Sequence, residues 1–334
     1  MSTLFALSPP EVSASDDDLQ DLQPRLTSDD ATVRRLALIE LVELEDEAHA
    51  PWLAWALRDP DPAIRADVAA RLAYWEQPVV LSALVGVLRD EVPAVREAAA
   101  YSLAEIKQAE SGALLLPALD GAQGFVLASL LHAIKELRLA GSLHAALRAT
   151  DDRDATVRLA AVGVLGWLKD ASALPVLTQL AAHDPEPEVR RAAVGALGLG
   201  QGHDAQVQPA LLGALQDPVW RVREEAAATL GKLKLPEAVG PLIQSLQDTY
   251  WQVRQLAARA LGRLKNAQAV DALITHALQH DIANLRKEAS VALGEIGHAS
   301  ALPALAIAAQ DPDPEVRKTA RLAVTLIQQR EGAC

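Results

Sequence analysis

The residues best suited to metal chemistry in this sequence are two histidines, His276 and His280, which stand four positions apart. On a helix this spacing places both imidazoles on one face, where they could bind a transition metal. Asp281 is adjacent, but the pair lacks a nearby cysteine or a third histidine. We therefore interpret the pair as two solvated residues near a helix end, and we expect no metal site and no cofactor.

A second set of chemically capable groups consists of aspartates and arginines, which an acid–base mechanism could use. An arginine, or in one case Leu127, returns every 31 to 33 residues, and an aspartate usually precedes it by six. One active site needs no such repetition, whereas stacked structural repeats do. The series therefore predicts contacts that join turn to helix within or between repeats. The arginines are Arg34, Arg65, Arg96, Arg158, Arg190, Arg223, Arg254, Arg286 and Arg317, and the aspartates are Asp59, Asp90, Asp184, Asp217, Asp248 and Asp311.

Other catalytic patterns are missing from the sequence. It contains no phosphate-binding P-loop, no glycine fingerprint after a strand and nothing that resembles a nucleophile elbow. We therefore expect no catalytic residues, and the sequence favours a protein that is not an enzyme.

Composition limits both the fold and the partners. Half of the 334 residues are hydrophobic but only 3% are aromatic, so the core is built from small aliphatic side chains, which suits closely packed helices. The net charge of −13 and the pI near 5.1 disfavour nucleic acid as a partner. The single cysteine, Cys334, permits no internal disulfide, and neither a signal peptide nor a long apolar segment is evident. These features predict a soluble cytoplasmic protein without a membrane span.

Each repeat follows one pattern. After the arginine, small or apolar residues fall at positions +3, +4, +7 and +10, as at Ala226, Ala227, Leu230 and Leu233, which form one face of a helix. Glycine commonly occupies +8, which indicates that a neighbouring backbone comes too close for a side chain. A more variable helix precedes each aspartate, as at residues 235–247. The predicted fold is an all-α, right-handed solenoid of about ten two-helix repeats.

The strings of the form D-P-x-P-x-V-R-x-x-A-x-x-A-L-G-x-L, clearest at 184–199 and 311–327, resemble the short HEAT-like repeats of the phycobilisome-lyase type. The resemblance covers residues 17–328, which we expect to form a single solenoid between a flexible segment at 1–16 and a tail at 329–334. Such repeats serve as scaffolds, chromophore-lyase subunits, hydroxylases and DNA-repair proteins. The fourth repeat departs from the pattern at Gly124 and Leu127.

In HEAT-like solenoids the second helices line the concave surface, and the resemblance implies the same arrangement here. Because the core takes +3, +4, +7 and +10, we expect +5 and +9 to face the groove. These positions carry aromatic, acidic and imidazole groups in the first half and bases in the second, a difference that could orient a partner segment. The candidate binding residues on this face are Tyr74, Tyr101, His132, Trp167, Arg259 and Arg263.

Two tryptophans, Trp220 and Trp251, stand three residues before a repeat arginine, where other repeats have Pro or Ala. Folding does not need an indole at this position. Because adjacent repeats lie roughly 10 Å apart, the two indoles are predicted to neighbour each other along one rim, with Arg221 and Tyr250 beside them. The rim is either an interaction site or a cover in which each indole packs over the neighbouring turn.

Three functions are compatible with these patterns. The first is a non-enzymatic scaffold that holds a protein or peptide in its groove. The second is an accessory component in the attachment of a cofactor or chromophore to a partner protein, with the aromatics and His132 against a flat cofactor. The third, nucleic-acid binding, is disfavoured by the charge. The sequence leaves the partner and the oligomeric state open.

Overall fold

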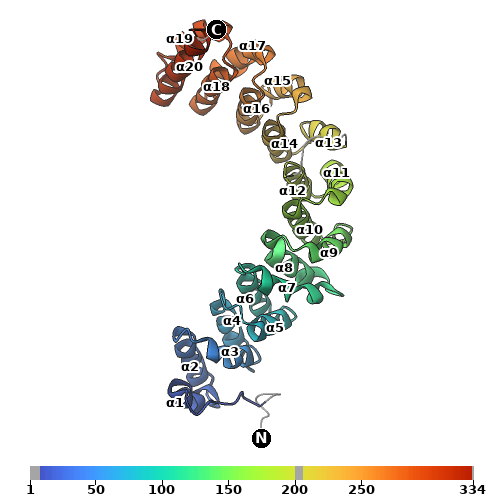
Figure 1. Cartoon of the computed structure of the whole chain (residues 1–334), viewed down its shortest axis with the longest axis vertical. Coiled ribbons are helices and arrows are strands. Elements are labelled where there is room, and N and C mark those ends of the chain that lie inside the picture. Colours follow the sequence, from blue (N-terminus) through green and yellow to red (C-terminus); the bar gives the residue numbers. More distant parts are fainter. Residues whose placement is uncertain (1–7, 200–205, 333–334) are drawn as a thin grey trace. The chain divides into compact units, whose positions relative to one another are not determined.

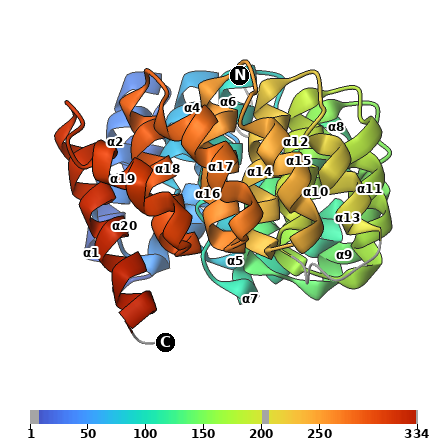
Figure 2. The same cartoon turned by 90° about the horizontal axis from the view of Figure 1, so that it is seen from above.

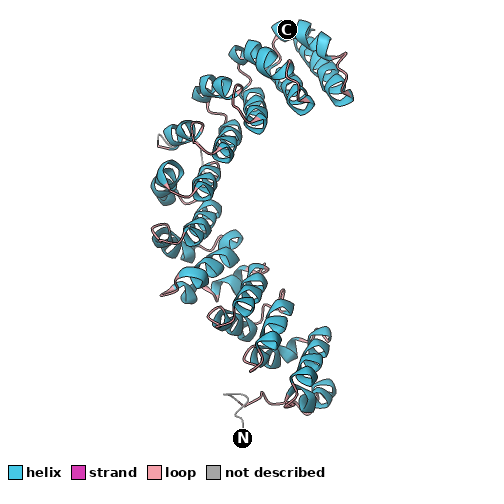
Figure 3. Ribbon diagram, turned by 180° about the vertical axis from the view of Figure 1, so that it is seen from behind, coloured by secondary structure: helices cyan, strands magenta, loops and turns pink. Residues whose placement is uncertain are grey.

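The computed structural model describes residues 8–199 and 206–332, and within these ranges the chain consists of helices and connecting turns without a strand (Figures 1 and 3). The predicted all-α solenoid is confirmed, and the twenty α-helices of the described ranges form ten consecutive pairs. The chain divides into two compact units, residues 1–168 and 169–334.

In the first, second, third and fifth pairs of the first unit the first helix packs against the second, and the second helices also pack against one another. The first helices are α1 (Asp17–Leu26), α3 (Ala50–Ala56), α5 (Pro78–Val87), α7 (Ala109–Ala113) and α9 (Leu143–Ala149). The second helices are α2 (Ala31–Glu43), α4 (Pro62–Arg71), α6 (Pro93–Ala104), α8 (Gly124–Ile134) and α10 (Ala155–Leu168).

The second unit repeats this arrangement. Its first helices are α11 (Leu174–His183), α13 (Val207–Ala214), α15 (Val239–Ser245), α17 (Val270–Leu273) and α19 (Leu302–Ala308). Its second helices are α12 (Pro187–Leu197), α14 (Trp220–Leu233), α16 (Trp251–Leu264), α18 (Ala283–Ile296) and α20 (Pro314–Gly332). Helices α16, α18 and α20 lie side by side in both views (Figures 1 and 2).

Short non-α turns lie between the helices, most of them between successive pairs. The 3₁₀ turns are η1 (Glu47–His49), η2 (Leu116–Leu119), η3 (Lys135–Leu137), η4 (Ala140–Ser142), η5 (Ala171–Ala173), η6 (Pro236–Ala238), η7 (Ala267–Ala269) and η9 (Ala299–Ala301). The element η8 (Ile274–Leu278) is instead a π-helical turn that continues α17.

The core follows the predicted helical face. Ala226, Ala227 and Leu230 of α14 are fully buried, whereas Leu233 at the helix end is half-buried. The glycine at +8 has the predicted cause, because a Cβ on Gly231 would lie 2.7 Å from the Cα of Ala260 in α16. A glycine at this position therefore lets the second helices approach more closely than side chains would permit.

The repeat aspartates lie in the turns that precede the second helices. The aspartate six residues before the arginine lies in the turn, where Asp59 accepts the N–H of Asp61 at 2.8 Å. Asp61, two residues later, is the N-cap of α4 and accepts the N–H of Ala63, and Pro62 fills the first helical position. In several other second helices, such as α14 with Val219 at its N-cap, no side chain caps the helix. The repeat aspartate thus stabilises the turn rather than the helix end.

The first and last helices bound the helical part of the described chain. Helix α1 begins at Asp17. Helix α20 ends at Gly332. Cys334 lies outside the described residues. Among the described helices, none combines the length and the apolar character needed to cross a bilayer.

Two glycines test the account of helix packing. We expect Gly231→Ala to destabilise the protein by about 1–3 kcal/mol, because its methyl group would clash with α16. The control is Gly240→Ala in α15, where an added Cβ meets nothing within 4 Å. That change should stabilise by up to about 1 kcal/mol through helix propensity. Urea unfolding of both variants measures the difference, and equal effects would contradict close packing at Gly231.

Candidate functional site

In most repeats the arginine joins two consecutive turns through its guanidinium. In Arg190, Nε and Nη2 donate to the two carboxylate oxygens of Asp217 at 2.7 and 3.0 Å, and Nη1 donates to the backbone carbonyl of Asp184 at 2.8 Å. Asp184 lies in the turn before Arg190, whereas Asp217 belongs to the next repeat. Two parallel bonds between a guanidinium and a carboxylate form one of the stronger polar contacts in proteins. We call each such arginine–aspartate pair a rung.

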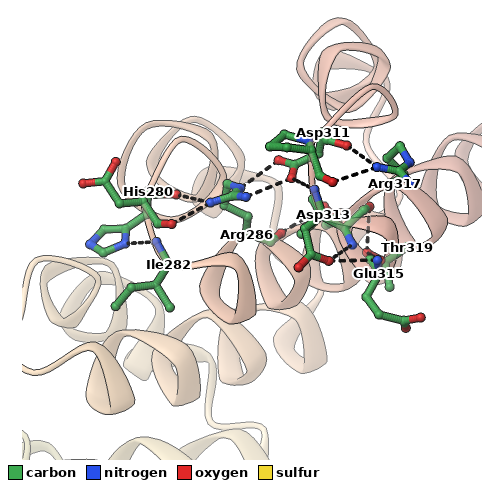
Figure 4. A network of polar contacts seen from close by, with 12 residues as sticks. His280, Ile282, Arg286, Asp311, Asp313, Glu315, Arg317 and Thr319 are labelled. Carbon is green, nitrogen blue, oxygen red and sulfur yellow. Dashed lines mark hydrogen bonds and ion pairs between the residues drawn. The ribbon is translucent and has the colours of Figure 1, made fainter.

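The rungs confirm that the arginine series is structural and that it acts both within and between repeats. Figure 4 shows the rung of the last two repeats, together with the bonds of Arg317 to its own turn. Bidentate rungs include Arg34–Asp59, Arg65–Asp90, Arg190–Asp217, Arg223–Asp248 and Arg286–Asp311.

In three rungs the pKa of the carboxyl group lies below its ordinary value. At Asp311 the hydrogen bonds from Arg286 hold the pKa of the carboxyl below its ordinary value, against a smaller opposing effect of burial. At Asp90 and Asp248 burial is the largest single influence and raises the pKa, but the arginine and a backbone N–H together outweigh it. In each case the net shift is downward, so the folded protein favours the charged carboxylate.

The series of rungs is interrupted at two places by the divergent fourth repeat. Leu127 replaces the arginine and is buried, which confirms that the series is interrupted there. Arg96 faces a turn in which Gly121 occupies the aspartate position, and its guanidinium lies 5.9 Å from the ring centre of Phe125. A cation–π contact thus replaces the ion pair of Arg96.

A further irregular rung lies in the second unit, and sequence reasoning missed it. His280 stands six residues before Arg286, where the sibling repeats have aspartate, so the signal was present in the sequence. Its Nδ1 accepts the N–H of Ile282 at 3.1 Å, and the other ring nitrogen points away from this bond (Figure 4). His280 therefore keeps the turn-stabilising bond of the aspartate but offers no carboxylate to Arg254.

The two histidines of the pair occupy different local structures. His276 lies in the π-helical turn η8, and His280 uses one ring nitrogen for the following turn. Among the described residues, no three His, Cys, Asp or Glu side chains are arranged to hold a metal ion.

The aromatic rim is partly what the sequence predicts. Trp220 stacks on Tyr250 of the next repeat, with ring centres 5.2 Å apart and planes 13° from parallel. Arg221 lies over the Trp220 ring, at 5.5 Å. The ring in contact with Trp220 is therefore that of Tyr250, whereas Trp251 is half-buried and makes no ring contact among the described residues. One indole covers the neighbouring turn, and the other does not stack.

The predicted groove residues of the first unit fall into two groups. Tyr74 and Tyr101 expose 74% and 60% of their surfaces, so both phenol rings are available to a partner. His132 lines an open pocket of about 430 Å³ with Glu105 and Lys107, and partial burial together with the Lys135 cation lowers the pKa of its imidazole. Trp167 is half-buried beneath the Arg138 guanidinium, 5.3 Å from the ring centre.

The predicted basic residues of the second unit have two different environments. Arg259 donates two hydrogen bonds to the buried carboxylate of Glu288, at 2.9 and 2.6 Å, so it has a structural role that the sequence did not reveal. Burial of an unpaired Glu288 would be costly. Arg263 is exposed and forms no ion pair with a described residue. The same holds for Lys232 and Lys265, near the ends of α14 and α16.

The architecture and these surfaces define the class of the protein. It is an α-solenoid of stacked helical pairs in which a row of rungs joins successive turns. The family model of HEAT repeats matches residues 50–135, 125–198, 182–249 and 239–325, and the chain belongs to this family.

Solved structures of similar fold agree. An engineered protein is 21% identical over 93% of this chain and 99% of its own, with a TM-score of 0.54. The Escherichia coli protein YibA is 21% identical over 90% and 99%, with a TM-score of 0.53. A triple mutant of Kap121p is 17% identical over 92% of this chain but only 41% of its own, with a TM-score of 0.56. No curated protein sequence matches the chain.

Adjacent arginines of α12 test the rung. Arg190→Ala should destabilise the protein by about 2–4 kcal/mol, because it leaves the carboxylate of Asp217 buried and unpaired. The control is Arg191→Ala, whose ion pair with Glu188 is 40% and 42% exposed at its two side chains. A surface pair of this kind is worth about 0.5 kcal/mol. Equal losses of melting temperature in the two variants would show that the rung stabilises the protein no more than a surface ion pair does.

The lowered pKa values predict acid lability. A carboxyl whose pKa is lower in the folded state contributes stability above its unfolded pKa of about 4, and this stability disappears as the pH falls through the folded pKa. The wild type should therefore lose unfolding free energy between about pH 5 and pH 2, and Arg223→Ala should lose less over the same range. Urea unfolding across this interval measures both slopes, and parallel slopes would exclude the rung of Asp248 as a source.

Proposed function

We propose that this protein is a non-enzymatic scaffold that binds a protein or peptide partner on the surface formed by its second helices and the turns that follow them. The observation that carries the proposal is the exposure of Tyr74, in the turn after α4, and of Tyr101, on α6. The repeat pattern does not require an aromatic residue at either position. Tyrosine presents a large, rigid, amphipathic surface at low entropic cost, which makes it common in binding sites.

The rim of the second unit supports the same function. Tyr250 is 44% exposed even though Trp220 covers one side of its ring, and Trp251 adds a half-buried indole beside it. Aromatic and arginine side chains are enriched in the residues that dominate binding energy. We propose Trp220, Arg221, Tyr250 and Trp251 as a second contact area, and Arg263 as an exposed base that attracts acidic groups of the partner.

A second candidate function follows from the resemblance of the repeats to the phycobilisome-lyase type. In that case the chain assists the attachment of a chromophore to another protein, and the pocket beside His132 accommodates the edge of the flat ring system. Incubation with candidate tetrapyrroles tests this function by absorbance. A stoichiometric spectral shift supports it, and an unchanged spectrum excludes it for the compounds used.

The scaffold function is tested by comparative affinity capture. Immobilised wild type should retain a partner that the double variant Tyr74→Ala/Tyr101→Ala retains at least tenfold less, because truncation of anchor residues costs about 2 kcal/mol or more in binding. The melting temperature should stay nearly unchanged, since both rings are exposed.

The matched control is Val79→Ala, which removes an exposed apolar side chain from α5, a first helix. This variant should retain the partner as the wild type does. Equal capture by the wild type and the tyrosine variant would remove the first-unit face from the proposal.

A further inference from the structure

Arg254 lacks the aspartate that completes a rung in the sibling repeats, and we call this incomplete position the open rung. In the sibling repeats the guanidinium takes the carboxylate of the next turn through Nε and Nη2, but here that turn supplies His280. Arg254 Nε instead donates to the backbone carbonyl of Asp248. No hydrogen bond or ion pair engages either terminal nitrogen of Arg254 with the described residues.

With His280 in place of the repeat aspartate, a hydrogen-bond donor replaces an acceptor at this position. Because His280 Nδ1 accepts the N–H of Ile282, the neutral imidazole carries its proton on the other ring nitrogen. The adjacent Asp281 is exposed and forms no ion pair with Arg254 in the described structure. This rung therefore has guanidinium and imidazole donors but lacks the anionic oxygens that complete its siblings.

The two other departures from the pattern do not leave such a cation. Arg96 lies over the ring of Phe125, and at Leu127 the arginine itself is missing. Arg317 belongs to α20, after which no further turn is described. Among the repeats that are followed by a described turn, Arg254 is thus a cation with neither a carboxylate nor a ring partner.

The surroundings of Arg254 favour a protein ligand. Trp251 stands three residues earlier on α16, so indole and guanidinium share one helix face. Trp251 is half-buried and does not stack on another ring in the described structure. Just beyond the rung, the chain also departs from helical regularity at the π-helical turn η8, and such turns are frequent at functional sites.

We infer that the open rung binds an Asp or Glu side chain of the partner, whose carboxylate takes the place of the missing repeat aspartate. The terminal nitrogens of Arg254 bind the carboxylate, and an apolar neighbour of the acidic residue packs on Trp251. The sibling rungs show that this guanidinium position binds an aspartate in a bidentate manner. The inference rests on the proposed scaffold function and names the chemistry of one contact.

The inference is tested by supplying the missing carboxylate from the chain itself. His280→Asp should create an Arg254–Asp pair like those of the sibling repeats and raise Tm by about 2–4 °C. The matched control, His276→Asp, places the same charge four residues away in η8 and should not raise Tm. A rise in Tm for neither variant, or for both equally, would contradict the geometry of the open rung.

Binding is then measured with two fluorescein-labelled pools of hexapeptides, which carry either one central Asp or one central Asn between apolar residues. The wild type should bind the Asp pool at least tenfold more tightly than the Asn pool. Both His280→Asp and Arg254→Ala should lose this preference. No preference in the wild type, or a preference that persists after the rung is closed, would overturn the inference. The Tm readout does not depend on a partner, so failure here is distinguishable from failure of the tyrosine face.

Discussion

The bidentate ion pair between one repeat and the next is the interaction on which the described architecture depends. A small aliphatic core orders each helical pair, but such a core is non-directional and does not by itself fix the offset between pairs. The rung does so, because its guanidinium must reach a carboxylate in the next turn and a carbonyl in its own turn at once. Its partners are largely removed from water, which makes an unpaired member costly and the paired arrangement specific.

The regularity of the rungs makes the irregular positions informative. In a chain of repeats, each position has siblings that show what folding alone requires. Folding accepts Pro or Ala where Trp220 and Trp251 stand, and it accepts Asp where His280 stands. Tyr74 and Tyr101 likewise expose rings that the pattern does not need. Departures of this kind are where function is expected to replace local stability.

Periodicity predicted most of the fold, because the spacing of arginine, glycine and alanine directly encodes helix faces and close approaches such as Gly231 to Ala260. It did not predict contacts that depend on rotamers across repeats. The ring that Trp220 meets is Tyr250, and the partner of Arg259 is Glu288, a residue outside the +5 and +9 positions considered. The hydrogen bond that Asp59 accepts from the N–H of Asp61 within its turn also required the backbone geometry.

The central claim, that a rung couples consecutive repeats, is tested most directly by a double-mutant cycle on Arg223 and Asp248. Unfolding free energies of the wild type, both single alanine variants and the double variant yield the coupling energy of the pair. The account predicts a coupling of about 1.5–3 kcal/mol, as expected for a largely buried charge-assisted pair. A coupling below about 0.5 kcal/mol, the value of an exposed ion pair, would contradict it.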